Sequence, residues 1–347
     1  KMRVIKKTIE QTTEHYNLIS EYETKFELQN DVEKGLSSIF LISQNIPLKS
    51  VSDFFSGENF SMIECFEELE ASYHLIKYGF YKQSMISLRT SLEIGLLSIY
   101  WSILGKESVE FKQWLSSKFD TPYKSKEFWE KIKSNENIKL FDEEFSLIEE
   151  IKEFGLSDFV HTKGIWYSNF GEFQRKLKGQ DKFENYQEWL TNFKDIVRIL
   201  EVLHLLRFPT LNIRFSTDYL LSKFGTFDSI PQFGSGFGNE MDNLSTFIPK
   251  NQLTLIHDIA NSDEEVIEIK KWINELPELT KEEIRNKIID NQKRNIQSCG
   301  FESWSSNLEI YDSRINSNMI QNLRKWAISK NFMTIENIIK THKKSRG

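Results

Sequence analysis

The sequence predicts an all-α protein, and three observations carry this prediction. The 347 residues include only six prolines and fifteen glycines, which is few for a fold of short strands and tight turns. Apolar residues recur at spacings of three and four over long stretches. The 27 Phe and 8 Trp residues supply ample area for a packed interior. We expect a multi-helix bundle around a central antiparallel helical hairpin, and a second, smaller, mostly helical C-terminal domain.

The central hairpin is predicted from two helical stretches, residues 61–78 and 80–105, that are separated by Gly79. Two long helices joined by so short a link lie antiparallel. One face of the second stretch carries only small residues at helical spacing, and this ridge lets another backbone come close. The ridge consists of Ser84, Ser87, Ser91, Gly95, Ser98 and Ser102.

Three regions are predicted along the chain. Residues 1–57 form an N-terminal helical layer, residues 58–209 form the bundle, and residues 210–347 form a mostly helical C-terminal region. The last boundary is placed at Pro209, since proline stops the long helix expected over 186–208.

The remaining helices are predicted from periodicity and from capping residues. Two helices within 4–43 are divided near Asn30, with Asp31 as a candidate cap. Ser125 is expected to cap a helix near 126–133, and 142–154 is expected to form one amphipathic helix. The segments SDEE at 262–265 and TKEE at 280–283 both match the capping-box motif. The last two helices are expected over 318–329 and 334–343.

The first candidate site joins Arg89 and Glu93, four residues apart on the buried central helix, with His161 from the short turn LSDFVHTKG. Arginine can clamp an oxyanion while histidine exchanges a proton near neutral pH, so the three are the parts of an acid/base or phosphate-handling site. The alternative is a structural network in which Arg89 pairs with Glu93 and His161 closes a turn.

The second candidate site is Arg198 with His204, in the word VRILEVLH of the helix before Pro209. Six residues place these side chains about 120° apart on an ideal helix. The hairpin, the word SLRTSLEIGLLSIYW, the FVHT turn and this Arg/His pair together resemble the HEPN superfamily over about residues 58 to 209. The resemblance implies an all-α, usually dimeric fold and metal-independent ribonuclease activity in bacterial defence and toxin systems. It also implies a composite site across the dimer to which Arg198 and His204 contribute.

The third candidate is the basic C-terminal end, where cations and aromatic residues are interleaved and could contact a phosphate backbone. A solvated helix face is the alternative. The proposed nucleic-acid-binding residues are Arg324, Lys325, Lys330, Lys343 and Lys344. The Gly-rich word at 234–240 lacks the Lys-Ser/Thr of a P-loop, and a flexible loop is favoured there.

Composition excludes several classes of protein. A net charge of −6 argues against a surface built throughout for nucleic acid. Cys65 and Cys299 have no disulfide or zinc spacing, so we expect a reducing, cytoplasmic location, no metal and no cofactor. The longest apolar run, 94–104, is too short to span a membrane.

Two functions of different class follow. The first is a HEPN-like anti-phage defence or toxin-type protein that engages RNA and is a candidate metal-independent endoribonuclease. The second is a non-catalytic helical sensor or scaffold that binds a protein partner. The HEPN resemblance and the surplus of aromatic residues also lead us to expect a homo-oligomer. The sequence leaves open the trigger, the partner's identity and the stoichiometry.

Overall fold

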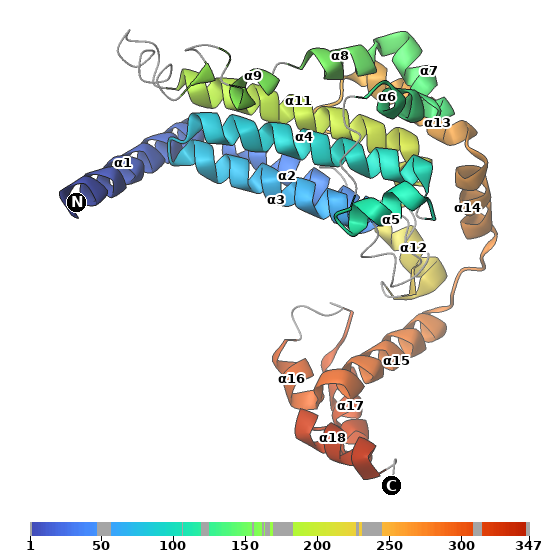
Figure 1. The fold of residues 1–347 in the computed structure, drawn as a ribbon. Coiled ribbons are helices and arrows are strands. Elements are labelled where there is room, and N and C mark those ends of the chain that lie inside the picture. Colours follow the sequence, from blue (N-terminus) through green and yellow to red (C-terminus); the bar gives the residue numbers. More distant parts are fainter. Residues whose placement is uncertain are drawn as a thin grey trace. The chain divides into compact units, whose positions relative to one another are not determined.

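The computed structural model confirms the all-helical class (Figure 1). It describes residues 2–46, 57–105, 107–118, 125–154, 156–161, 163, 167–168, 183–226, 229–230, 245–307 and 314–344. Within these ranges no residue belongs to a β-strand. The Gly-rich word at 234–240 lies outside them.

The chain divides into two compact units. The first comprises residues 1–214 and 232–268, and the second comprises residues 215–231 and 269–347. Each unit has its own cluster of buried apolar side chains, so each is described by itself.

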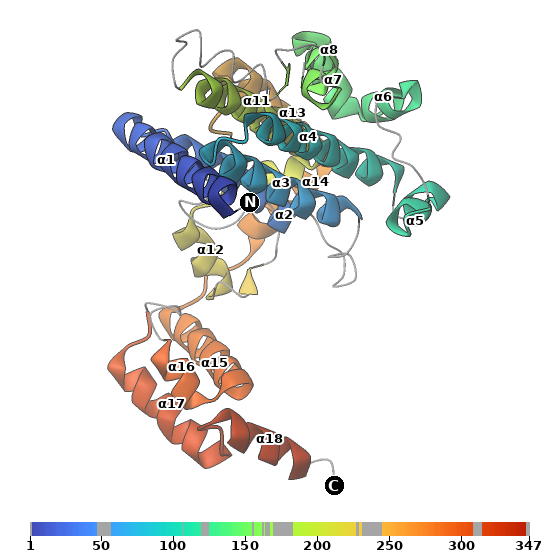
Figure 2. The same ribbon diagram turned by 60° about the vertical axis from the view of Figure 1, so that its left-hand side comes forward.

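Four long helices form the centre of the first unit (Figures 1 and 2). They are α2 (Gln29–Asn45), α3 (Gly57–Lys77), α4 (Tyr81–Leu104) and α11 (Glu184–Arg207). α4 packs against α3 and α11, and α2 packs against the same two helices from the other side. The four helices therefore surround one apolar core, in the manner of a four-helix bundle.

α3 and α4 are joined by three residues, Tyr78 to Phe80, and run antiparallel (Figure 1). Gly79 has a φ of +83°, a conformation in which a side chain would be strained. The amide of Phe80 donates to the carbonyl of Leu75 (2.9 Å), and that of Gly79 donates to the carbonyl of Ile76 (3.1 Å). These bonds satisfy the last carbonyls of α3, as glycine-terminated helices commonly do.

The predicted ridge of small residues on α4 contacts two other helices. Ser84 and Ser72 of α3 each donate a hydroxyl hydrogen bond to the other's carbonyl, at 2.9 and 3.0 Å. Farther along, a Cβ added to Gly95 would lie 2.5 Å from Cδ2 of Leu200 on α11. The ridge thus allows close approach to α3 near its start and to α11 farther on.

Further helices cover this bundle. α1 (Met2–Phe26) leads into α2, α6 (Lys126–Lys133) and α9 (Ser157–Val160) pack on α4, and α7 (Glu136–Phe145) packs on α11. The others in this unit are α5 (Val109–Leu115), α8 (Leu147–Glu153), the 3₁₀ turn η3 (Pro209–Asn212) and α13 (Lys250–Ser262).

Two helix breaks differ from the sequence prediction. The helix expected over 142–154 is two helices, α7 and α8, because Ser146 takes the left-handed conformation with φ +52°. The carboxylate of Asp142 then accepts the amide of Ile148 at 2.7 Å. Likewise the break between α1 and α2 lies at Glu27 (φ +54°), and Asp31 falls inside the first turn of α2 without capping it.

Of the four predicted caps two are correct, and the Asp31 cap of α2 is one of the two that are wrong. Ser125 caps α6 by accepting the amide of Phe128 at 3.0 Å. Thr280 and Glu283 form the predicted capping box of α15 (Lys281–Cys299). At the remaining helix, α14 (Glu264–Glu275), the carboxylate of Asp263 accepts the amide of Val266 at 3.2 Å, so the cap is Asp263 and not Ser262.

The second unit has a small core of its own. It contains α12 (Thr217–Phe224), α15 (Lys281–Cys299), α16 (Phe301–Ser306), α17 (Ser317–Lys330), α18 (Ile335–Lys344) and the later part of α14. Trp304 is fully buried and donates its indole N–H to Gln292 at 2.9 Å. The buried residues that form this core cluster are Ile296, Phe301, Trp304, Leu323 and Ala327.

The first prediction concerns the close approach of α4 and α11. Gly95→Leu should lower the free energy of unfolding by about 1–3 kcal/mol, because the added side chain collides with Leu200 in a packed core. Urea unfolding of the purified protein measures this change. Gln83→Leu, at an exposed position of the same helix, is the control and should have little effect. Equal stability of both variants would contradict the packing described here.

Candidate functional site

Arg89 and Glu93 pair on α4 as the sequence suggested. Nε of Arg89 lies 2.7 Å from Oε1 of Glu93, and the side chains are 17% and 26% exposed. Nη1 of Arg89 is buried and has no hydrogen-bond partner. The guanidinium therefore holds a buried donor that no described group of the protein satisfies.

His161 does not join this pair. It is exposed at the end of α9. That short helix is anchored through Phe159, whose ring meets Tyr81 edge-on at 5.6 Å. Tyr81 lies about two helical turns before Arg89. Among the described residues no hydrogen bond or ion pair links His161 to Arg89 or Glu93, so the three do not form one cluster.

Arg198 is held by carboxylates at the side of α11. Its Nη2 forms an ion pair with Oε1 of Glu150 on α8, and its Nε lies 4.0 Å from Oδ1 of Asp195. The side chain of Arg198 is 11% exposed. Because the guanidinium is nearly buried and paired, its main consequence is to fasten α8 to α11.

His204 is enclosed between α11 and α4. Nδ1 lies 2.7 Å from the carbonyl of Leu200, which can only accept, so Nδ1 carries the proton. Nε2 lies 3.3 Å from the Ser98 hydroxyl and accepts from it in the neutral ring. The imidazole is fully buried. Burial lowers its pKa from 6.5 to about 4, against the opposing effect of the Leu200 hydrogen bond, so the ring is neutral at pH 7.

Arg198 and His204 consequently face different neighbours, as their spacing on a helix suggests. Arg198 contacts α8, whereas His204 contacts α4. In this chain they do not form a joint site.

Glu201 lies on α11 between them and was not identified from the sequence. Its Oε1 accepts the Ser38 hydroxyl of α2 and, at 3.0 Å, the amide of Ser245. Its Oε2 is buried without a hydrogen-bond partner. Burial raises the pKa of this carboxyl from 4.5 to about 7, although both hydrogen bonds and the nearby Arg198 act against the shift. Glu201 thus connects α11 to α2 and to the chain segment before α13.

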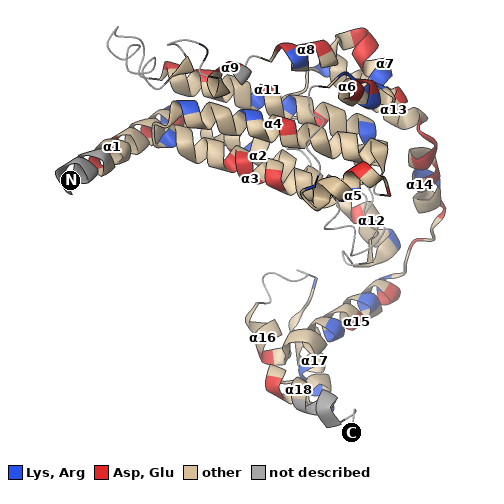
Figure 3. Ribbon diagram, in the orientation of Figure 1, with Lys and Arg blue, Asp and Glu red and all other residues tan. Residues whose placement is uncertain are grey.

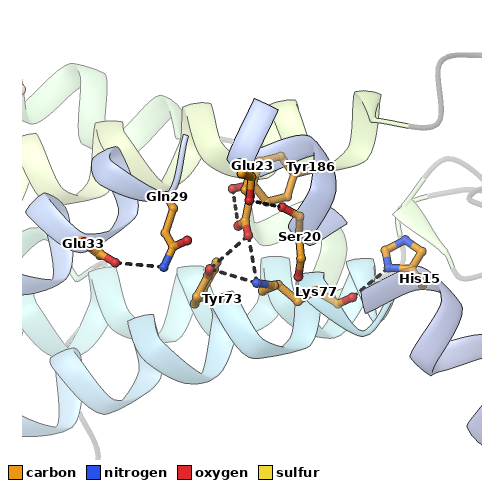
Figure 4. A network of polar contacts seen from close by, with 9 residues as sticks. His15, Ser20, Glu23, Gln29, Glu33, Tyr73, Lys77 and Tyr186 are labelled. Atoms are coloured by element: carbon orange, nitrogen blue, oxygen red, sulfur yellow. Dashed lines mark hydrogen bonds and ion pairs between the residues drawn. The ribbon is translucent and has the colours of Figure 1, made fainter. Parts of the chain in front are cut away.

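A second buried polar network joins α1 to α3 and α11 (Figure 4). The carboxylate of Glu23 pairs with Nζ of Lys77 at 2.9 Å and accepts the Tyr186 hydroxyl at 2.7 Å. The hydroxyl of Tyr73 donates to it at 3.3 Å. Burial and the charge of Glu23 raise the pKa of Tyr73 to about 12, so this hydroxyl stays protonated. Nδ1 of His15 lies 2.9 Å from the Lys77 carbonyl.

Next to this network is a cleft of about 800 Å³ between α1 and α11, a volume within the usual range for ligand sites. We name it the α1–α11 cleft. It is lined by Leu18, Glu21, Tyr22, Lys25, Phe26, Leu28, Phe183, Gln187, Leu190, Thr191 and Lys194. Sequence reasoning did not identify it, because its walls are more than 150 residues apart in the chain.

The candidate nucleic-acid-binding residues of the second unit are partly described. Arg324, Lys325 and Lys330 are exposed on α17, in a unit where basic residues also recur along α15 (Figure 3). None of the three has a carboxylate partner among the described residues. Lys343 and Lys344 belong to α18, but their side chains lie outside the described part of the chain.

Other classes of site are not found in the described ranges. No group of three His, Cys, Asp or Glu side chains there is arranged to hold a metal ion. None of the described helices combines the length and the apolar character that crossing a bilayer requires. The two cysteines are unpaired. Burial raises the pKa of Cys65, which makes its thiol a packing group and not a nucleophile.

Comparison with known proteins assigns no relative: no family model, no curated protein and no solved structure matches the chain.

The second prediction concerns Glu201. The carboxyl group of Glu201 holds its proton more tightly in the folded protein than in the unfolded chain, because its pKa is raised from 4.5 to about 7. The protonated carboxyl therefore contributes stability that is fully present below pH 4.5 and is lost as the pH rises through 7. Glu201→Gln cannot ionise. The free energy of unfolding of the variant minus that of the wild type should therefore rise by about 3 kcal/mol between pH 4.5 and about pH 8.

Urea unfolding at several pH values measures this difference. The titration of His204 is present in both proteins and cancels. A difference that does not change with pH would show that Glu201 ionises as readily in the folded as in the unfolded state.

Proposed function

We propose that this protein is a non-catalytic helical sensor or scaffold that binds a protein partner. It is built on a bundle centred on the α3–α4 hairpin, with a smaller helical unit after it. The observation that carries the proposal is the enclosure of His204, with both ring nitrogens engaged by the protein.

A general acid or base must come within hydrogen-bond reach of the proton that it transfers. No surface of the His204 ring is exposed to a substrate. Its lowered pKa also leaves almost no imidazolium at pH 7 to protonate a leaving group. The Arg198 guanidinium is engaged by Glu150 in a different direction. These observations favour a structural role for both residues.

The third prediction tests this role directly. The purified protein, incubated with fluorescently labelled single-stranded RNA in EDTA, should leave the RNA intact. His204→Gln should leave it equally intact and should lower the free energy of unfolding by about 1–3 kcal/mol, because the buried hydrogen bonds are lost. An added ribonuclease provides the positive control. Cleavage by the wild type that disappears in a folded His204→Gln variant would restore the ribonuclease hypothesis.

A second candidate function is RNA engagement by a HEPN-like defence or toxin-type protein through the pair Arg89 and Glu93, without His161. One observation favours it: the buried Nη1 of Arg89 has no partner, on a side chain that is still partly exposed. The exposed cations of α17 could add phosphate contacts in this case. A composite HEPN-type site would further require a homo-oligomer.

The fourth prediction distinguishes the two functions. Replacing both partners by apolar residues, Arg89→Met with Glu93→Leu, should leave the fold intact, since it avoids a lone buried charge. If RNA binds there, the double variant should lose RNA affinity in a gel-shift assay at least tenfold. The matched control is Lys126→Met with Glu130→Leu, an exposed pair at the same spacing on α6. RNA affinity that is equal in the two double variants would exclude the Arg89 site.

A further inference from the structure

Aromatic side chains form one wall of the α1–α11 cleft, and one of their rings is exposed to solvent. Tyr22 stacks on Phe183 with ring centroids 3.9 Å apart and planes 9° apart. The ring centroid of Phe26 lies 4.8 Å from that of Tyr22, and the Phe26 residue is 52% exposed. Leu18 and Leu190 extend the apolar lining. Phe26 thus offers an apolar surface that the described residues leave half exposed.

Beside the aromatic wall, a hydrogen-bond donor and an acceptor are adjacent and unused. Nε2 of Gln187 donates to the Tyr22 hydroxyl at 2.6 Å. The hydroxyl proton of Tyr22 and the Oε1 atom of Gln187 have no further partner within the described part of the chain. One can donate to a carbonyl while the other accepts an N–H, which matches the two groups of a peptide backbone.

Charged residues of both signs line the cleft, and one of its cations has no carboxylate within ion-pair distance among the described residues. Two lysines and one glutamate line it, in a chain whose net charge is −6. Lys25 is exposed, and its ammonium lies 5.2 Å from the Phe26 ring centroid. It has no carboxylate partner among the residues the structure describes. Lys194, which lines the cleft from α11, pairs with Asp31. An incoming carboxylate would therefore meet an uncompensated cation next to an exposed aromatic ring.

The two helices that form the walls of the cleft are held together by the polar network of Glu23. The Glu23 carboxylate, one residue from Tyr22, binds Lys77 of α3 and Tyr186 of α11. Fixing α1 to these helices means that a ligand does not have to order the cleft when it binds, which favours affinity.

We propose that the α1–α11 cleft binds an acidic peptide segment of a partner protein, in which an aromatic or large aliphatic residue lies next to Asp or Glu. The apolar side chain packs on Phe26, the carboxylate pairs with Lys25, and the backbone bonds to Tyr22 and Gln187. This inference rests on the partner-binding function proposed above and specifies the partner's chemistry.

The test is selection of a phage-displayed library of random twelve-residue peptides on the whole protein. Selected peptides are synthesised with a fluorescent label, and fluorescence polarisation measures their affinity. The expected result is enrichment of peptides with adjacent acidic and aromatic or large aliphatic residues. Lys25→Glu and Phe26→Ala should each weaken their binding at least tenfold. Both residues are exposed, so the variants should fold, and thermal melts verify this.

Lys34→Glu is the matched control, because Lys34 is an exposed lysine on α2 outside the cleft. It should leave peptide affinity within twofold of the wild type. Selected peptides that are neutral or basic, or that bind the two cleft variants as tightly as the wild type, would overturn the cleft assignment while leaving a partner-binding function in place. The absence of any enriched peptide would also overturn the assignment. RNA cleavage lost in the His204 variant would instead overturn the partner-binding function itself.

Discussion

The close approach of α4 to α3 and α11 is the constraint on which the first unit depends. Small residues at one face of α4 bring the backbones together, and every polar atom between them must then find a partner within the protein. Ser84 exchanges hydrogen bonds with Ser72, and Ser98 meets the ring of His204. The same closeness that lets the helices pack removes water from His204. Its low pKa is therefore a consequence of packing and requires no catalytic explanation.

The buried carboxyl groups of Glu23 and Glu201 differ in the partners that they have in the fold. The Glu23 carboxylate has a cation and two hydroxyls as partners, so its burial is compensated. Glu201 has two hydrogen-bond donors on one oxygen, none on the other and no cation in contact. Its carboxyl therefore avoids full ionisation at neutral pH. The first group fixes α1 to the bundle, while the raised pKa of Glu201 makes the α11–α2 contact sensitive to pH.

The helical class and several caps could be predicted because they depend on local spacing. The 3.6-residue period and the Thr280–Glu283 pair are both contained within one turn or one helix. The helix break at Ser146 could not be predicted, because serine does not mark a left-handed conformation in the sequence as glycine does. Glu201 did carry a signal, as a charge within an apolar run, and the same reasoning that selected Arg89 and Glu93 would have found it. Glu23 carried none, because charged residues are frequent throughout α1.

The candidate sites differ from one another chiefly in what their polar groups already bind. Arg198 is engaged by α8, and His204 is engaged by α4 and by a carbonyl of its own helix, so binding a ligand to either residue would first require breaking those contacts. In the α1–α11 cleft, no described residue pairs with Lys25, with the hydroxyl proton of Tyr22 or with Oε1 of Gln187. A ligand would gain hydrogen bonds to these groups without that cost. Binding free energy is the surplus over such costs. On this ground the proposed binding surface is the side of α11 that faces α1, whereas the side that carries His204 packs against α4 within the bundle.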